Sequence, residues 1–185
     1  MARVPVRRGL YAITPDTADG QTLLLRVEAA IRGGAVMVQY RNKTADAKLR
    51  RAQAAALNAL CRKLGVPLIV NDDAELAAEV GAAGAHLGTD DGDLAAARRV
   101  LGPDKLLGAS CYDRIELAER AAGLGADYLA FGSFFASPTK PLAVRAPMAL
   151  IGDAQRKFGL RSRPSAALPG TTRRNWCRRV PTGCA

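Results

Sequence analysis

Six short segments of this chain are almost continuously apolar, and each is followed by a segment with helical spacing of its apolar residues. Continuous apolar runs are typical of parallel strands, because helices cover both faces of such a sheet. The sequence predicts strands over residues 9–14, 35–40, 67–70, 84–88, 106–109 and 127–131. It predicts helices over residues 24–31, 45–64, 74–80, 94–101, 114–124 and 148–158. This alternation is typical of the α/β class.

The first turn distinguishes the two common parallel α/β folds. A doubly wound sheet usually carries a glycine-rich turn after its first strand. Here residues 14–16 read Thr-Pro-Asp, and no G-x-G-x-x-G occurs in the chain. A (β/α)8 TIM barrel fits better, and Gly-Ala pairs that open three of the predicted strands indicate a repeated unit. We therefore predict a (β/α)8 barrel that is incomplete, with about six β/α units and an irregular tail.

Composition bounds the class of protein. The 185 residues are 49% apolar and 5% aromatic, which suits one domain with an aliphatic core. No apolar stretch is long enough to span a membrane, and the basic segment 1–8 is not followed by the apolar core of a signal peptide. Four cysteines without close pairing predict reduced thiols. We expect a cytoplasmic protein with no membrane partner.

The net charge of +10 is concentrated near the C-terminus. Eight Lys and Arg residues follow Asp153, the last acidic residue, and the preceding part has 19 basic and 17 acidic residues. The body of the protein is therefore close to neutral. This distribution argues against nucleic acid as the main partner, although a basic tail could bind it nonspecifically.

Polar residues follow five of the predicted strands at their carboxyl ends, where barrel enzymes carry their chemistry. These residues are Gln39, Arg41 and Lys43; Asn71 and Asp72; Asp90 and Asp91; Ser110; and Ser137, Thr139 and Lys140. Each cluster alone could be a helix cap or a strand end that has reached solvent. Five clusters with both signs of charge on one rim favour a binding site.

Two chemistries follow from these residue types. Asp72 and Asp91 end consecutive strands, and two carboxylates with ligand oxygens suit Mg²⁺, although Asp72 could instead cap the next helix. Strand alternation is expected to place Gln39, Arg41 and Lys43 on one side, and together with Lys140 they suit a diphosphate. His86, the one histidine, and the cysteines 61 and 111 are interpreted as packing residues.

The sequence resembles the bacterial thiamine-phosphate synthase family over roughly residues 9–158. The matching stretches are Gly-Leu-Tyr-Ala-Ile-Thr at 9–14, Gln-Tyr-Arg-Asn-Lys at 39–43, Val-Asn-Asp-Asp at 70–73, His-Leu-Gly at 86–88 with Asp91, Gly-Ala-Ser-Cys at 108–111, and residues 127–141. The resemblance implies a (β/α)8 barrel that joins a pyrimidine diphosphate to a thiazole phosphate. The products are thiamine phosphate and diphosphate, and both substrates are small molecules.

The resemblance also implies residue roles. Magnesium would be held by Asp72 and Asp91. The pyrimidine diphosphate would be bound by Gln39, Tyr40, Arg41, Asn42, Lys43, Asn71, Ser110 and Lys140. The thiazole phosphate would be bound by Ser137, Pro138 and Thr139, where serine at 137 is a mild departure from the family. The implied mechanism is dissociative: diphosphate leaves first, the thiazole nitrogen attacks the resulting cation, and no protein general base is needed.

The resemblance ends near residue 159. Residues 161–185 contain three prolines, no acids and no apolar periodicity, so we predict a barrel domain at 1–159 and a disordered basic tail at 160–185. Our hypothesis is that the tail is translated out of frame, because residues 160–168 back-translated and shifted by one base can read Pro-Val-Ala-Ala-Ile-Gly-Gly-Ile. Without strands seven and eight and their phosphate loop, we expect impaired activity and aggregation.

Two alternative functions remain open from the sequence. A related thiazole tautomerase shares the barrel but needs neither two metal carboxylates nor a diphosphate site, so Asp72 and Asp91 favour the synthase. A barrel fragment without catalytic activity, whose basic tail binds nucleic acid, is the other alternative.

Overall fold

The computed structural model of the chain describes residue 6 and residues 9–134, 145–158 and 162–164. The chain divides into two compact units, residues 1–108 and residues 109–185. Strand β5, Leu106–Tyr112, runs through the division between them.

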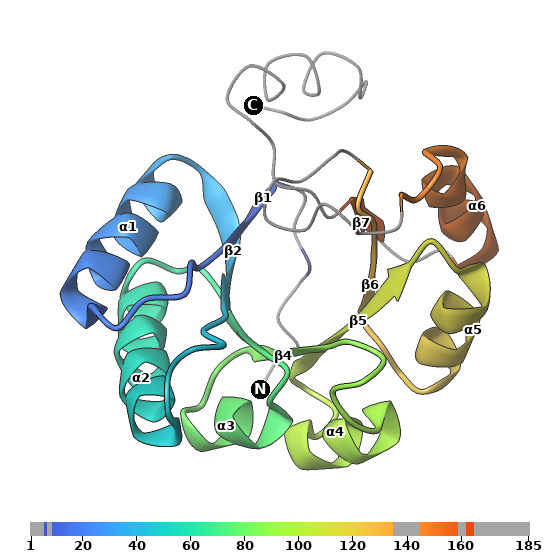
Figure 1. The fold of residues 1–185 in the computed structure, drawn as a ribbon. Helices are drawn as coiled ribbons and strands as arrows, with labels where there is room; N and C mark the ends of the chain where they lie inside the picture. The colour runs from blue at the N-terminus through green and yellow to red at the C-terminus, as the bar shows by residue number, and fades with distance from the viewer. Residues whose placement is uncertain (1–5, 7–8, 135–144, 159–161, 165–185) are drawn as a thin grey trace. The chain divides into compact units, whose positions relative to one another are not determined.

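The first unit alternates strands and helices, and its strands pair in chain order, each parallel to the next (Figure 1). Figure 1 shows the helices of this unit outside its strands. The elements are β1 Leu10–Ile13, α1 Gly20–Arg32, β2 Ala35–Tyr40, α2 Ala47–Lys63, β3 Leu68–Asn71, α3 Ala74–Glu79, β4 Gly84–Leu87 and α4 Leu94–Leu101.

The core of the first unit lies between its strands and helices. Alternate strand residues point toward the helices and pack in one apolar cluster; they include Val38 and Tyr40 on β2 and Leu68 and Val70 on β3. Alternation therefore places Gln39 on the opposite face of the sheet. Since β3 and β4 are in register with Asn71 opposite His86, the polar residues at their carboxyl ends lie side by side.

All four helices of the first unit begin with an aspartate cap, at Asp19, Asp46, Asp73 and Asp93. In each case a side-chain oxygen accepts a hydrogen bond from a backbone N–H of the first turn, which a new helix leaves without a partner. The cap of α3 is Asp73, so the alternative role of Asp72 as a cap is wrong, and the Asp72 carboxylate is left for other contacts.

Gly84 is required by a close approach between strands. A Cβ atom at this position would lie 1.9 Å from the carbonyl oxygen of Leu106, and the backbone N–H of Leu106 donates to Ala83 at 2.8 Å. Any side chain at 84 would push β4 away from its neighbour. The Gly-Ala pair that opens this strand in the sequence has a steric cause.

The second unit contains the end of β5, α5 Ile115–Gly123, β6 Tyr128–Phe131, α6 Ala149–Phe158 and β7 Ser162–Pro164. An ion pair joins Lys157 on α6 to Glu119 on α5. Strand β7 pairs with β6 in parallel register, with Leu129 opposite Ser162. The expectation that no strand follows residue 159 is therefore wrong, because three residues of the predicted tail extend the sheet of this unit.

The remaining predicted elements agree closely with the structure. The predicted strands begin and end within a few residues of β1 to β6, and each predicted helix is present. Helix α1 begins at Gly20, four residues before the predicted start, because Asp19 caps it. Strand β5 continues to Tyr112, so Ser110 lies within the strand instead of after it. None of the described helices is long and apolar enough to cross a membrane.

Candidate active site

Strand β2 ends at Tyr40, and residues 41–43 leave the sheet as a loop. The Thr14 hydroxyl group holds the start of this loop: it accepts a hydrogen bond from the backbone N–H of Arg41 and donates to the Arg41 carbonyl oxygen, both at 2.8 Å. Strand alternation therefore holds only as far as Tyr40, and it does not decide where the side chains of Arg41 and Lys43 point.

Gln39 is a buried polar residue on the face of the sheet opposite α2. Its side chain is 4% exposed, and the described residues give its carboxamide no hydrogen bond. A buried polar group without a partner is costly, and such groups in native proteins call for an explanation. Among the described residues, the Gln39 carboxamide is therefore a candidate contact for a ligand with polar edges.

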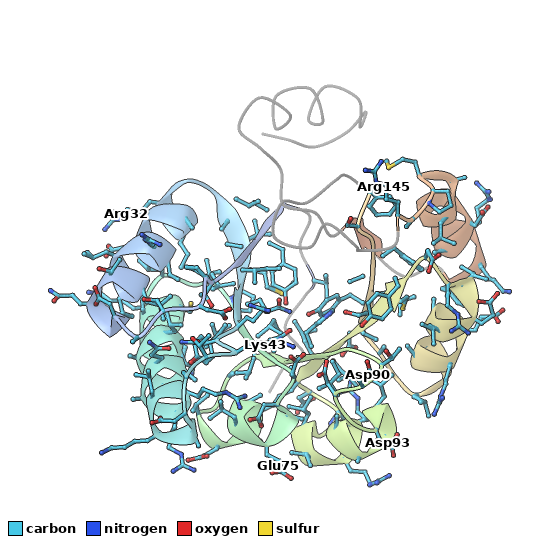
Figure 2. All side chains as sticks on the ribbon, in the orientation of Figure 1. Arg32, Lys43, Glu75, Asp90, Asp93 and Arg145 are labelled. Atoms are coloured by element: carbon cyan, nitrogen blue, oxygen red, sulfur yellow. The ribbon has the colours of Figure 1, made fainter. Side chains whose placement is uncertain are left out.

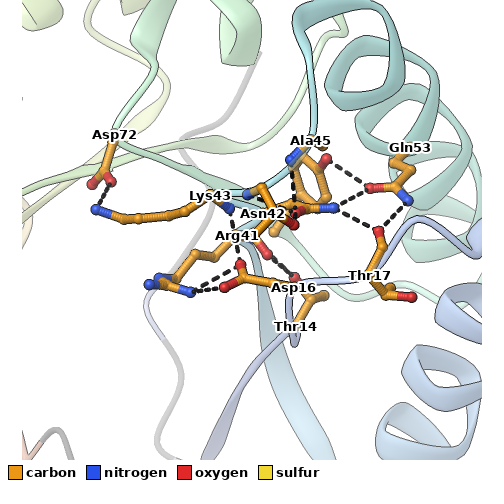
Figure 3. A network of polar contacts seen from close by, with 11 residues as sticks. Thr14, Asp16, Thr17, Arg41, Asn42, Lys43, Ala45, Gln53 and Asp72 are labelled. Carbon is orange, nitrogen blue, oxygen red and sulfur yellow. Dashed lines mark hydrogen bonds and ion pairs between the residues drawn. The ribbon is translucent and has the colours of Figure 1, made fainter. Parts of the chain in front are cut away.

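Tyr40 and Asn42 use their polar atoms inside the protein (Figure 3). The Tyr40 hydroxyl group donates to Oε1 of Gln53 on α2 at 2.9 Å, and Asn42 Nδ2 donates to the same oxygen at 3.0 Å. The Thr17 carbonyl oxygen accepts from Asn42 Nδ2 at 2.7 Å and from Gln53 Nε2 at 2.9 Å. We call these four residues, Thr17, Tyr40, Asn42 and Gln53, the closed network.

Asn42 also shapes the loop that follows it. Its Oδ1 accepts from the backbone N–H groups of Thr44 and Ala45 and from the Thr44 hydroxyl group, at 3.0 to 3.3 Å. Burial raises the pKa of Tyr40 to about 12, so its hydroxyl group stays a neutral donor at physiological pH. Through these contacts, Tyr40 and Asn42 hold the β2–α2 loop in place.

Asp72 and Asp91 lie together at the carboxyl ends of β3 and β4. Asp72 has a left-handed backbone, with φ 61°, and its N–H donates to the His86 carbonyl oxygen at 2.8 Å. Asp91 is held by the backbone N–H of Gly88, which donates to Oδ2 at 2.9 Å. Burial, and then a hydrogen bond with Asp91, raise the pKa of the Asp72 carboxyl group.

Lys43 faces this pair of carboxyl groups. Its Nζ lies 3.1 Å from Asp72 Oδ2, and this contact acts against the rise in the Asp72 pKa (Figure 3). Figure 2 shows Lys43 toward the inner side of the strands of the first unit, whereas Arg32 and Glu75 lie on the outer side of its helices. We call Lys43, Asn71, Asp72 and Asp91 the open site. The structure brings the Asp72 and Asp91 carboxyl groups together, and their role as metal ligands stays a prediction.

A pocket of about 210 Å³ adjoins the open site. It is lined by Tyr40, Asn42, Lys43, Ala45, Arg50, Asn71 and Asp72. Arg50, on the first turn of α2, pairs with the cap residue Asp73 at 3.0 Å. The pocket therefore brings a second cation, not foreseen from the sequence, to the same rim as Lys43.

His86 is buried beneath the open site, as the sequence predicts. Burial lowers the pKa of its imidazole to about 4, while the charge of Asp91 acts in the opposite direction. The ring is therefore neutral at physiological pH. It fits the predicted role of a packed residue and not that of a protein base poised near neutrality.

The carboxylate pair fits a divalent cation in its chemistry. Two acidic groups close enough to share a hydrogen bond repel each other when both are ionised, and a bound cation removes that repulsion. The described part of the chain contains no cluster of three or more His, Cys, Asp or Glu side chains that could form a complete protein cage. The pair would thus supply part of a coordination sphere and leave positions for other oxygens.

The other predicted site residues are placed differently. Ser110 belongs to the second unit, on β5, and is half-buried. The four predicted residues Ser137, Pro138, Thr139 and Lys140 lie outside the described residues. Two residues that sequence reasoning missed, Gln53 and Asp16, contact the β2–α2 loop. Asp16 follows β1 as the other polar residues follow their strands, and this position could have signalled it.

Comparison with known proteins places this arrangement in a family. The model of the family described as "Thiamine monophosphate synthase" matches residues 10–185. The thiamine-phosphate synthase of Thiobacillus denitrificans is 53% identical over 167 residues, which cover 90% of this chain and 78% of the relative. That of Chromobacterium violaceum is 57% identical over 150 residues, covering 81% of this chain and 72% of the relative.

This chain belongs to the thiamine-phosphate synthase family. The relative from Aromatoleum aromaticum is 49% identical over 178 residues, which cover 96% of this chain and 84% of the relative. The family is one of enzymes, and the sequence-based recognition is confirmed. The family match continues to residue 185 and so extends beyond residue 159, where the sequence-based resemblance ends.

Solved structures agree with the family. The thiamine phosphate pyrophosphorylase from Pyrococcus furiosus is similar with a TM-score of 0.75 and 26% identity, covering 91% of this chain and 79% of that one. A 3-dehydroquinate dehydratase from Geobacillus kaustophilus shares the fold alone, with a TM-score of 0.61 and 16% identity. The predicted fold class, an incomplete (β/α)8 barrel with six β/α units, is confirmed for this synthase family member.

Proposed function

We propose that this chain is a transferase of thiamine biosynthesis that makes thiamine phosphate. The substrates are 4-amino-2-methyl-5-(diphosphooxymethyl)pyrimidine and thiazole phosphate. The bond between the pyrimidine methylene carbon and the diphosphate oxygen breaks, and a bond from that carbon to the thiazole nitrogen forms. Diphosphate leaves with the electron pair, so no proton transfer is needed at the reacting carbon. The relatives' names support this reaction.

The observation that carries the proposal is the open site. Lys43 lies 3.1 Å from one of two adjacent carboxyl groups, so a cation and a potential metal site meet at the carboxyl ends of β2, β3 and β4. A departing diphosphate gains negative charge as its bond breaks. Fixed positive charge at that position stabilises the transition state more than the bound substrate.

Magnesium is the cation that suits these carboxylates, and Asp72 and Asp91 would hold it. When bound, it would neutralise part of the charge on the diphosphate. The left-handed backbone at Asp72 and the Gly88 N–H that holds Asp91 fix both carboxyl groups before ligands arrive. Such preorganisation reduces the cost of assembling the site.

The remaining roles divide between binding and support. We assign the diphosphate to Lys43 and Arg41, and polar contacts to the pyrimidine substrate to Gln39 and Asn71. The buried carboxamide of Gln39 supports this assignment. Support of the loop is assigned to the closed network residues Tyr40 and Asn42, in place of the direct contacts implied by resemblance. Further substrate contacts remain proposed at Ser110, Lys140, Ser137, Pro138 and Thr139.

The proposal is tested by incubating the purified chain with both substrates and measuring thiamine phosphate and diphosphate. We expect equal amounts of the two products, no reaction without a divalent cation, and recovery when Mg²⁺ is restored. Release of diphosphate without thiamine phosphate, or no product under any condition, would contradict the proposal. A thiazole tautomerase would convert its substrate without a pyrimidine diphosphate, so omitting that substrate distinguishes the two enzymes.

The expected impairment is a separate hypothesis. It rests on the composition of residues 160–185, and the family match through residue 185 lends it no support. We retain as a proposal the boundary between a barrel domain at 1–159 and a basic tail. The DNA sequence across codons 155–185 decides whether a frameshift is possible. A filter-binding titration with and without residues 160–185 tests nonspecific nucleic-acid binding, and cell fractionation tests the predicted cytoplasmic location.

A further inference from the structure

The loop after β1 contains an acidic residue that the predicted site does not include. The Asp16 carboxylate accepts hydrogen bonds from Arg41 Nη1, at 3.0 Å to Oδ1 and 3.2 Å to Oδ2. Its Oδ1 also accepts from the backbone N–H of Lys43 at 2.9 Å. One carboxylate therefore contacts both basic residues of the β2–α2 loop, as Figure 3 shows.

The contacts of Asp16 complement those of Thr14. The Thr14 hydroxyl group fixes the Arg41 backbone on both sides of its Cα atom, and Asp16 fixes the side chain. Residue 41 is thus held at the backbone and at the guanidinium group by one neighbouring loop. A free arginine side chain carries about 2 kcal/mol of rotamer entropy, which an anionic ligand would otherwise have to overcome.

The geometry leaves Arg41 able to bind an anion while it is paired. Both described hydrogen bonds of its guanidinium group to Asp16 use Nη1. A guanidinium group has five N–H donors, so donors on Nε and Nη2 remain for a phosphate oxygen. The Arg41 and Asp16 side chains are 29% and 33% exposed, so the pair is accessible to a ligand.

We propose that Asp16 is a positioning residue for the diphosphate site, acting through Arg41 and the Lys43 backbone. The inference rests on the proposed function, because the anion that it prepares for is the diphosphate of the pyrimidine substrate. A negative charge near an anion site could instead weaken binding by repulsion. The contacts favour positioning, because they hold the Arg41 guanidinium group and the backbone from which the Lys43 side chain extends.

A double-mutant cycle tests the proposal. Asp16→Asn removes the charge but keeps an oxygen for the Lys43 N–H, and it is made alone and together with Arg41→Ala. The matched control is Asp19→Asn, which removes a charge from the same loop and keeps a good helix cap. Affinity for inorganic diphosphate with Mg²⁺ is measured by calorimetry, KM and kcat are measured with both substrates, and thermal unfolding monitors folding.

Asp16→Asn is expected to weaken diphosphate binding about tenfold when Arg41 is present and less than twofold when it is alanine. KM for the pyrimidine diphosphate should rise by about the same factor, with kcat changed less than twofold. Asp19→Asn should change none of these values by more than twofold. An equal loss in both backgrounds, unchanged binding, or tighter binding after Asp16→Asn would overturn the inference.

The result also separates this inference from the proposed function. If the unchanged chain binds diphosphate and makes thiamine phosphate while Asp16→Asn behaves like Asp19→Asn, only the positioning role fails. If the unchanged chain neither binds diphosphate nor makes product, the proposed function fails and the role of Asp16 fails with it.

Discussion

The closed network and the open site meet at the end of β2, yet their polar groups differ in whether the protein itself satisfies them. In the closed network, Gln53 receives two donors and the Thr17 carbonyl oxygen receives two more, all from within the protein. In the open site, two carboxyl groups lie beside each other, and one lysine pairs with Asp72. The first region is complete without a ligand, whereas the second has excess charge that a ligand would balance.

Mutations in the two regions should therefore affect different properties of the protein. Removing a buried hydrogen-bond partner from the closed network should lower stability, because other groups lose their contacts. Removing a charge from the open site should change ligand binding and leave stability nearly unchanged, because the two carboxylates there repel each other in the folded protein. Four substitutions test this division.

Asp72→Asn should cause the largest effect. We expect thiamine phosphate formation to fall at least about 100-fold at saturating Mg²⁺, because one proposed metal ligand is lost. The free energy of unfolding should stay the same or rise, since repulsion from Asp91 disappears and asparagine tolerates the left-handed backbone. The assay follows product formation, and urea unfolding measures stability.

The control is Asp73→Asn, which keeps the α3 cap and should retain activity within about threefold. Equal losses of activity in the two variants would contradict the division between the two regions.

Gln53→Ala should lower the free energy of unfolding by about 2 kcal/mol, because the buried Tyr40 hydroxyl group loses its acceptor and the Thr17 carbonyl oxygen loses a donor. Urea unfolding is the measurement. Gln21→Ala, at an exposed position on α1, provides the control and should change stability by less than about 0.5 kcal/mol. A stability loss as small as that of the control would show that the closed network is not structural.

Lys43→Met should weaken diphosphate binding about tenfold, because one cation of the open site is lost. Its side chain is 54% exposed, so the ion pair with Asp72 should contribute less than about 1 kcal/mol to stability. Calorimetry with Mg²⁺ and diphosphate measures the first effect, and urea unfolding measures the second. Lys48→Met, at an exposed position on α2, should leave binding within twofold of the original.

Tyr40→Phe should have the smallest effect, a loss of about 1 kcal/mol of stability with nearly unchanged kcat. The raised pKa also predicts a pH dependence. Because the folded state keeps the proton until about pH 12 and the unfolded state loses it near 10, stability should fall between these values. Tyr40→Phe should remove that part of the fall and one step above pH 10 in the tyrosine absorbance titration. A large loss of activity with unchanged stability would indicate that Tyr40 contacts the substrate, as the family resemblance implies.

Much of the fold could be predicted from the sequence because its signals are local. Continuous apolar runs give the strands, and the rule that parallel strands carry function at their carboxyl ends brought Asp72 and Asp91 together. The role of Gln53 could not be predicted in this way, because a buried glutamine on α2 resembles a surface residue in sequence. The position of Asp16 after β1 follows the same rule, but its partner Arg41 lies 25 residues further along the chain and no local signal identifies it.

The left-handed backbone at Asp72 restricts how this enzyme could be altered. A residue with positive φ must be small or able to bond locally, so Asn and Gly are the replacements that the main chain accepts readily. Glutamate would strain the turn and also carry its oxygens one methylene further from the main chain. Efforts to adapt the proposed metal site to a larger cation would therefore do better to vary position 91 and leave 72 unchanged, so the shape of a single turn would limit the choice of metal.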